Sequence, residues 1–278
     1  MIVRSNSDGG FDLEVRSRQP MVYLDNWALS RALAVDETRR ERFLETFKTK
    51  GTLLFSWVNV MELGNSIFNR SAPIRLLLDG IGEQWLPIES NPFTSFKREN
   101  AQQPGANSPA FSETLLRAYY PHVHGGALTL SSVFDLLRHD NGAKARDAQQ
   151  QLKATVRQFI DEIKRGHRLD PTWLDKRYPV LALDPQRPTL FVFTELLRAL
   201  ASERGLTFTP NDGIDLFHAT VPVAYSDFVL LDKSWTRRVR ALKMPGRPLY
   251  AFAEPELDSF LDAFEHCEIV SGGLAHTS

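Results

Sequence analysis

The segment MVYLDNW, residues 21–27, is a short apolar run that ends at an acid and continues into a helical pattern. A continuous apolar run of this length indicates a buried strand. Asn26 can cap the helix that follows, and Trp27 and Leu33 suit one face of that helix. The segment therefore predicts a strand whose carboxyl end carries Asp25, with a helix directly after it.

The same alternation of strand and helix recurs toward both ends of the chain. Further apolar strand candidates lie at 52–55, 85–88, 228–231 and 248–252. Helical patterns are found at 37–48, 56–68, 73–81, 212–224, 234–243 and 256–264. Strands that alternate with helices are typical of an α/β core, so we expect a central, mostly parallel sheet.

The middle of the chain has a different composition. Residues 92–109 are rich in Pro, Asn, Gln and Ser, which favours a loop, whereas 112–204 has a helical pattern with a break at Gly166. This middle part is predicted to be an all-helical insertion into the α/β core, with its longest helix at 144–164. The expected organisation is a polar extension at 1–20, a first core part at 21–91, a mainly helical insertion at 92–205, a second core part at 206–270 and a tail at 271–278.

The composition of the 278 residues is that of a globular protein with a substantial core. Hydrophobic residues at 42% and charged residues at 24% exclude a disordered or fibrous chain. No apolar run approaches the roughly 18 residues of a membrane-spanning helix, and residues 1–20 contain no apolar signal segment. The single Cys267 excludes an internal disulfide and a multi-cysteine zinc site. We therefore expect a cytoplasmic protein that does not associate with membranes.

Four acids are expected to meet at one edge of the sheet. Asp25 and Asp232 each end an apolar strand, Glu62 lies on the helix after the second strand, and Asp215 lies at the start of the helix before 228–231. The carboxyl ends of parallel strands share one edge, where open α/β sheets bind their ligands. Carboxylates held close together repel one another, and a divalent cation relieves that repulsion. Oxygen ligands without cysteine favour one or two Mg²⁺ or Mn²⁺ ions.

Each of these acids also has a structural interpretation. Asp25 can cap the helix that follows it, and Glu62 can be a solvated helix residue. Asp215 can interact favourably with a helix N-terminus, and Asp232 can be a turn residue. The order and context of the four acids carry more information than any one of them.

Five further residues are secondary candidates. Asp227 and Asp212 are additional candidate metal ligands, although Asp227 can instead face solvent and Asp212 can instead cap a helix. Asn26, Ser56 and His218 are candidates for substrate contact. His218 lies on the same helical face as the acid three residues before it, and a packed structural histidine is the alternative.

The chain contains a strongly basic segment although its net charge is only −1. The window 233–247 contains six cations and no acid, for a charge of about +6. The candidates for binding the phosphates of a substrate are Lys233, Arg237, Arg238, Arg240 and Lys243. Each phosphate that such a residue neutralises adds salt-dependent affinity. A solvated basic face without a partner is the alternative, and Trp235 within it can stack on a base or pack in the core.

Several short motifs together resemble the pattern of PIN-domain nucleases. They are VYLDNW at 22–27, LFS at 54–56 leading into MEL at 61–63, DLFHA at 215–219 and YSDFVLLDK at 225–233. The closing LYAF at 249–252 and PELDSFL at 255–261 are similar to the last strand and helix of that family. The resemblance covers about 20–90 and 205–265 and leaves out the helical middle. The family often has Thr and an extra Asp in its fourth strand, where this chain has Leu230 and Leu231.

The resemblance implies a three-layer PIN-like fold and a divalent-metal-dependent endoribonuclease. The catalytic residues would be the four acids Asp25, Glu62, Asp215 and Asp232, which would hold Mg²⁺ or Mn²⁺. Such ions bind the scissile phosphate and lower the pKa of an attacking water. Single-stranded or structured RNA would be the substrate. An inhibitory protein partner and a homodimer are further expectations.

Two alternatives stay open on the sequence. One is a catalytically silent PIN-like module that binds RNA or protein. The other is a different metal-dependent phosphoryl-transfer enzyme, such as a phosphatase that begins with a strand-terminal acid. That class normally needs a second Asp two residues later, where this chain has Trp27. A nucleotide-binding fold is disfavoured because the chain has no G-x-x-x-x-G-K-[ST] motif.

Overall fold

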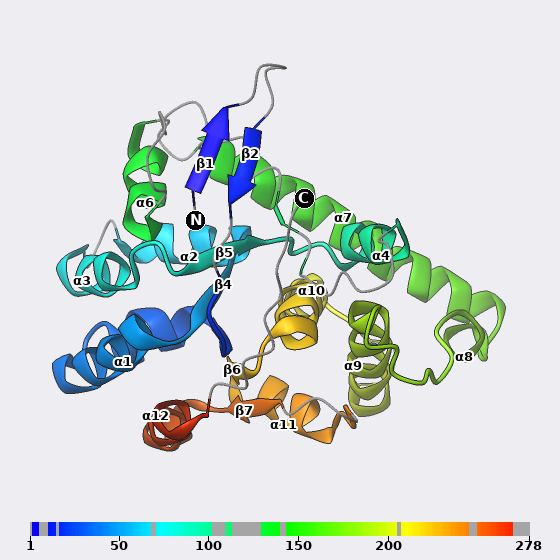
Figure 1. Ribbon diagram of the computed structural model, residues 1–278. Coiled ribbons are helices and arrows are strands. Elements are labelled where there is room, and N and C mark those ends of the chain that lie inside the picture. The colour runs from blue at the N-terminus through cyan, green and yellow to red at the C-terminus, as the bar shows by residue number, and fades with distance from the viewer. Residues whose placement is uncertain are drawn as a thin grey trace.

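The computed structural model places a five-stranded sheet at the centre of the molecule (Figure 1). It describes residues 2–5, 11–14, 17–67, 71–101, 109, 111–112, 129–139, 143–204, 207–244 and 249–268. The strands of the sheet are β3 (Met21–Leu24), β4 (Thr52–Ser56), β5 (Trp85–Ile88), β6 (Phe228–Leu230) and β7 (Tyr250–Phe252). All neighbouring pairs are parallel, in the order β5-β4-β3-β6-β7. The predicted α/β class with a mostly parallel central sheet is therefore confirmed.

β3 occupies the middle of the sheet and joins the two halves of the chain. Its residue Val22 pairs with Leu53 of β4 on one side and with Phe228 of β6 on the other. All four residues of β3 are buried. A strand covered on both faces reads as a continuous apolar run, which is why MVYL was recognisable in the sequence.

Helices cover both faces of the sheet. In the first half of the chain they are η1, a π-helix (Ala28–Leu33), α1 (Glu37–Thr49), α2 (Trp57–Ile67), α3 (Ser71–Ile81) and α4 (Pro92–Ala101). The middle contributes α6 (Leu130–His139), α7 (Ala143–Leu169), α8 (Trp173–Arg177) and α9 (Pro188–Arg204). The last part contributes α10 (Pro210–Tyr225), α11 (Lys233–Ala241), the 3-10 helix η3 (Glu254–Glu256) and α12 (Leu257–His266).

Successive residues of each strand contribute to two different hydrophobic clusters. Val22 and Leu24 belong to the cluster that contains α1, α3, α6 and α12, whereas Tyr23 belongs to the cluster that contains α7, α9, α10 and α11. This alternation follows from the period of two along a strand. The arrangement is that of a three-layer α/β protein, with helices on both sides of one sheet.

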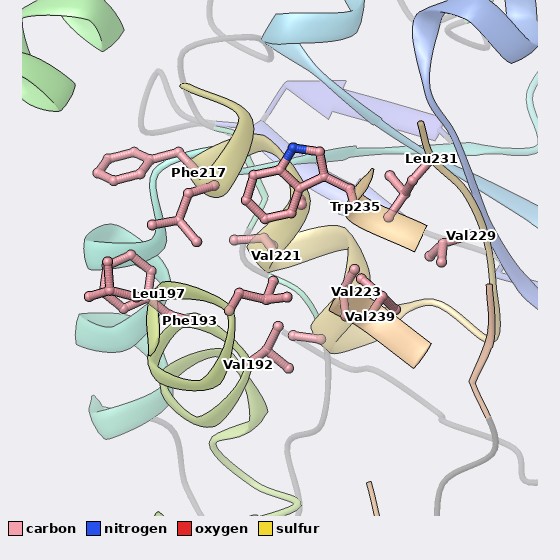
Figure 2. Close-up of a cluster of buried hydrophobic side chains, with 14 of the residues drawn as sticks. Val192, Phe193, Leu197, Phe217, Val221, Val223, Val229, Leu231, Trp235 and Val239 are labelled. Atoms are coloured by element: carbon pink, nitrogen blue, oxygen red, sulfur yellow. The ribbon is translucent and has the colours of Figure 1, made fainter. Parts of the chain in front are cut away.

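The helices between β5 and β6 complete the second cluster. α10 packs against β3, and α7 and α9 in turn pack against α10. Figure 2 shows how side chains of α9, α10, β6 and α11 meet in this cluster, with Phe193 and Phe217 on one side and Trp235 and Val239 on the other. The segment predicted at 92–205 therefore lies between the two halves of the sheet in sequence, and in space α7 and α9 lie on the side of the second cluster whereas α6 belongs to the first.

The loop predicted at 92–109 is wrong for its first part, because α4 occupies Pro92–Ala101. Pro92 suits the first turn of a helix, where its missing N–H would have no partner. The Asn91 side chain accepts a hydrogen bond from the Phe93 N–H at 3.0 Å, which caps the start of the helix. Phe93 and Phe96 then pack against the second cluster, so tertiary contacts outweigh a loop-like composition.

Two smaller expectations also differ from the structure. Residues 1–20 were expected to be an extension without periodicity, but β1 (Ile2–Ser5) and β2 (Phe11–Glu14) pair in an antiparallel ladder. α7 continues through the expected break at Gly166, where the lack of a side chain leaves room for the Trp173 ring, which a Cβ atom would meet. None of the helices within the described residues combines the length and apolar composition needed to cross a membrane.

Candidate active site

The four predicted acids line one pocket of about 460 Å³. Asp25 directly follows β3 and Asp232 lies just beyond β6, so both occupy the carboxyl edge of the sheet. Glu62 reaches the pocket from α2 and Asp215 from α10. The expected gathering of acids from four separate segments is therefore what the fold produces.

The backbone around Asp25 explains why the chain turns at this edge. The Asp25 N–H still donates to Leu230 O at 3.0 Å, as a further rung between β3 and β6. The Asp25 carbonyl then accepts from the N–H groups of Ala28 and Leu29, at 3.0 and 3.2 Å, and so starts the helical turn. The side chain is fixed locally, since its Oδ1 accepts from the Asn26 N–H at 2.7 Å.

Capping hydrogen bonds fix the starts of two helices at the pocket: α10, which carries Asp215, and α11, which follows Asp232. α10 is capped by Thr209, whose hydroxyl accepts from the Asp212 N–H, while the Asp212 carboxylate accepts from Thr209. Asp215 follows one turn later and points into the pocket wall. Asp232 caps α11 through Oδ1, which accepts from the N–H groups of Ser234 and Trp235 at 2.7 and 3.1 Å. Asp232 is therefore both a cap and a pocket residue.

Three of the carboxyl groups, those of Asp25, Glu62 and Asp215, hold their protons more tightly than free side chains do. Burial raises the pKa of Asp25 to about 6, and the charges of Asp232 and Asp215 add to this rise against the hydrogen bond from Asn26. Burial and the charges of Asp25 and Asp215 raise the pKa of Glu62 to about 7. Burial and the charge of Asp232 raise the pKa of Asp215 to about 6. These shifts express the cost of placing several carboxylates together away from water.

The pocket also has the donor chemistry of a site for a divalent cation. Within the described part of the chain, the buried side-chain oxygen of Asn26 and the buried indole nitrogen of Trp27 have no hydrogen-bond partner. Carboxylate and amide oxygens are the ligands that Mg²⁺ and Mn²⁺ prefer. Among the residues that the structure describes, no three His, Cys, Asp or Glu side chains surround one point. The carboxylates thus share a pocket without converging on a single centre.

Similarity to known proteins does not assign this pocket. No protein-family model matches the chain, and it matches no curated protein and no solved structure. The chemistry of the pocket therefore has to be argued from its own residues.

Both secondary acids, Asp227 and Asp212, lie away from the pocket. Asp227 precedes β6, at the opposite end of that strand from Asp232, and its carboxylate accepts from the Met21 N–H at 2.6 Å. Its backbone also bonds to Met21 and to Tyr250, so it organises the amino edge of the sheet. Asp212 is held in the capping box of α10. Neither carboxylate takes the ligand position that the sequence suggested.

Ser56, His218 and Asn26 have buried or partly buried positions near the acids. The Ser56 hydroxyl is buried and donates to Asn59 Oδ1 at 3.0 Å, so it serves the start of α2 rather than a substrate. His218 lines the pocket and bonds to the hydroxyl of Tyr23. Burial lowers the pKa of His218 to about 3, so its ring is neutral near pH 7. Asn26 lines the pocket next to Asp25.

The basic segment divides into structural and exposed residues. The Arg238 side chain is only 4% exposed, pairs with Glu203 at 2.7 Å and lies over the Trp235 ring. Arg240 donates to Ala251 O at 2.8 Å and pairs with Glu256. These two guanidinium groups therefore bind protein partners, in contrast to the predicted phosphate contacts. Four members of the set are exposed, namely Lys233, Arg237, Arg240 and Lys243, and of these Arg237 also pairs with Glu203.

Arg31 and Trp27 are pocket residues that the sequence analysis did not propose. Trp27 directly precedes η1 and Arg31 lies within it, and Arg31 is exposed at the pocket. Within the described residues Arg31 forms no ion pair. Their position in the sequence could have indicated this role. The first turns of a helix that follows a strand-terminal acid lie at the same edge of the sheet as that acid. A π-helix in this segment is also a common feature of functional sites.

Proposed function

We propose that this chain is a PIN-like endoribonuclease that depends on a divalent metal ion. The observation that carries the proposal is the pocket at the carboxyl edge of the sheet, where carboxylates from four segments lie together. Three of these carboxyl groups have a raised pKa. Proteins accept such a cost mostly at functional sites. The resemblance of the motifs around the acids to PIN-domain nucleases supports the same activity and is the argument for RNA as the substrate.

Asp25, Glu62, Asp215 and Asp232 would hold Mg²⁺ or Mn²⁺ in their ionised forms. Bound there, such an ion would neutralise the phosphate and lower the pKa of the water that attacks phosphorus as the P–O bond to the leaving oxygen breaks. Trp235 donates its indole N–H to Asp215, which keeps one of these carboxylates oriented. The Asn26 side-chain oxygen is a further oxygen donor in the pocket wall.

Cations beside the acids would bind the phosphate backbone of the substrate. Arg31 lies at the pocket on the side of η1, and Lys233 follows Asp232 directly at the start of α11. Both side chains are exposed. The two side chains flank the carboxylates from two different elements, so they would contact the RNA near the scissile phosphate. Without a bound metal ion, the carboxylates themselves would repel the RNA backbone.

The test is cleavage of a mixed pool of single-stranded and structured RNA, and of a DNA pool of the same sequences, with Mn²⁺, Mg²⁺ or EDTA. We expect metal-dependent cutting of RNA and a loss of about 100-fold or more in Asp25→Asn and Asp215→Asn. The matched control is Asp147→Asn, which removes an exposed carboxylate from α7 and should cut like the wild type.

Four outcomes would overturn the proposal or a part of it. Cutting in EDTA would exclude a metal-dependent mechanism, and undiminished cutting by Asp25→Asn would remove the pocket from the reaction. RNA that is bound but not cut with either cation would favour a catalytically silent RNA-binding module. Preferential cutting of DNA would retain the nuclease and reject RNA as the substrate.

A further inference from the structure

A continuous chain of buried hydrogen bonds runs behind the carboxylate pocket. Ser56 and Asn59 stand at the start of α2, Tyr23 lies on β3, and His218 lies on α10. The Asn59 amide donates to Leu24 O at 3.2 Å and to the Tyr23 hydroxyl at 3.5 Å, and that hydroxyl bonds to His218 Nε2. All four side chains are buried. The chain therefore links four elements, β4, α2, β3 and α10, through the core.

The direction of each hydrogen bond in this chain is fixed by one backbone group. The Ser56 N–H can only donate, and it lies 3.0 Å from Asn59 Oδ1, so that atom is the amide oxygen. The other end of the amide is then the NH₂ group, which donates to the Tyr23 oxygen. The hydroxyl hydrogen of Tyr23 has an acceptor in His218 Nε2 when the ring proton is on Nδ1, and this is the tautomer assigned to the neutral histidine.

Three of the four members of the chain are close in sequence to one of the carboxylates. The pairs along the sequence are Tyr23 with Asp25, Asn59 with Glu62, and His218 with Asp215. The first pair is two residues apart on one extended segment, and each of the other pairs is separated by about one helical turn. Fixing these three buried side chains relative to one another therefore fixes the starting points of three carboxylates.

Apolar packing alone would not give this precision. The surrounding cluster is non-directional, whereas hydrogen bonds constrain distance and angle. Buried polar groups also cost stability unless they are paired, so a chain of four polar side chains is a costly alternative to apolar residues of the same size. We infer that Tyr23, Asn59 and His218 are positioning residues for the carboxylate pocket. The inference rests on the proposed function, because the pocket they position is the proposed metal site.

The test compares two tyrosines that each lose a buried hydroxyl. Tyr23→Phe removes the link between Asn59 and His218. Tyr225→Phe is the matched control, because the Tyr225 hydroxyl donates to Glu99 at 2.6 Å in a buried bond at the far end of α10. We expect Mn²⁺ affinity, measured by titration calorimetry, to fall about 10- to 100-fold in Tyr23→Phe and to change less than about twofold in Tyr225→Phe. RNA cleavage should lose kcat with little change in KM.

A pair of histidine variants provides the rescue. In His218→Gln the side-chain oxygen can accept the Tyr23 proton near the place of Nε2, so Mn²⁺ affinity should stay within about threefold of the wild type. In His218→Leu no acceptor remains, and the affinity should fall as in Tyr23→Phe. This pair decides the question by itself if Tyr23→Phe does not fold.

A metal-free readout separates failure of this inference from failure of the proposed function. The ¹⁵N shifts of the His218 ring should show Nδ1 protonated and Nε2 accepting in the wild type without any cation. An Nε2–H tautomer, or equal Mn²⁺ affinity in Tyr23→Phe and the wild type, would overturn the positioning role. Equal losses in Tyr23→Phe and Tyr225→Phe would overturn it too, by indicating general loosening. A wild type that does not bind Mn²⁺ would overturn the proposed function itself.

Discussion

The Glu62 carboxyl group is partly buried beside Asp25, and burial together with that neighbouring charge raises its pKa to about 7. The two residues come from different elements, α2 and the end of β3. A folded protein that holds this proton to pH 7 binds it more tightly than the unfolded chain, where the ordinary pKa is 4.5. The consequence is a measurable pH dependence of stability.

Without metal, the contribution of Glu62 to stability should be complete below about pH 4.5 and lost as the pH rises through about 7. Glu62→Gln stays neutral and avoids that loss. We expect this variant to melt roughly 2–6 °C higher than the wild type at pH 8 in EDTA, and at the same temperature at pH 4. Thermal melts between pH 4 and 8 measure this. The control is Glu45→Gln on the exposed face of α1, which should show no such gain. A Glu62→Gln melt equal to the wild type at pH 8 would contradict the electrostatic account.

Arg31→Ala should weaken RNA binding without affecting the fold. Its guanidinium is exposed at the pocket, so each phosphate contact it makes contributes a salt-dependent increment. We expect the affinity measured by fluorescence anisotropy in EDTA to fall about threefold to tenfold, and the slope of log affinity against log salt to decrease by about one. Arg157→Ala removes an exposed arginine from α7 and should leave both unchanged. An identical slope in Arg31→Ala would place the substrate elsewhere.

Arg238 and Arg237 share the partner Glu203 but differ in burial, with side chains 4% and 69% exposed. Arg238→Ala leaves a cavity beside Trp235 and takes the buried partner from Glu203, so we expect a loss of about 2–4 kcal/mol in urea unfolding. Arg237→Ala should cost less than about 1 kcal/mol, because an exposed ion pair contributes little. Similar losses in the two variants would show that burial is not what distinguishes them.

Asp227→Asn tests whether the ends of β6 supply a second acid to the pocket besides Asp232. Its carboxylate accepts from the Met21 N–H at the amino end of the strands, whereas Asp232 lies at the carboxyl end. An amide oxygen can accept the same bond, so we expect Mn²⁺ affinity and cleavage to change less than about twofold. Asp232→Asn, measured in parallel, should lose both. A comparable loss in Asp227→Asn would require a different site.

The strands β3, β4, β5 and β6 were predictable because every one of their residues is buried. β3 and β6 appear in the sequence as apolar runs that end near acids, and parallel strands bring such ends to one edge. α4 was not predictable from composition, since Asn91 and Pro92 suit a loop as well as a helix start. Its packing against the second cluster decides the outcome.

The site was predictable to the extent that it depends on strand ends and helix starts. The roles of the arginines were not, because they depend on partners that are remote in sequence. Arg238 is engaged by Glu203, which belongs to α9, and no local pattern around Arg238 indicates that ion pair. The position of Arg31 at the pocket was not predicted, because hydrophobic periodicity marks the buried face of a helix and does not distinguish among its exposed residues.

The central place of β3 also determines when the site can form during synthesis. β3 pairs with β4, which follows closely, and with β6, which is made some two hundred residues later. A ribosome-bound chain that ends before α10 has neither Asp215 nor Asp232 to set beside Asp25. Contacts of such long range close late and slow the folding of a domain. An unfinished or truncated copy of this chain thus lacks part of the carboxylate pocket, which can form only once translation has passed β6 and Asp232.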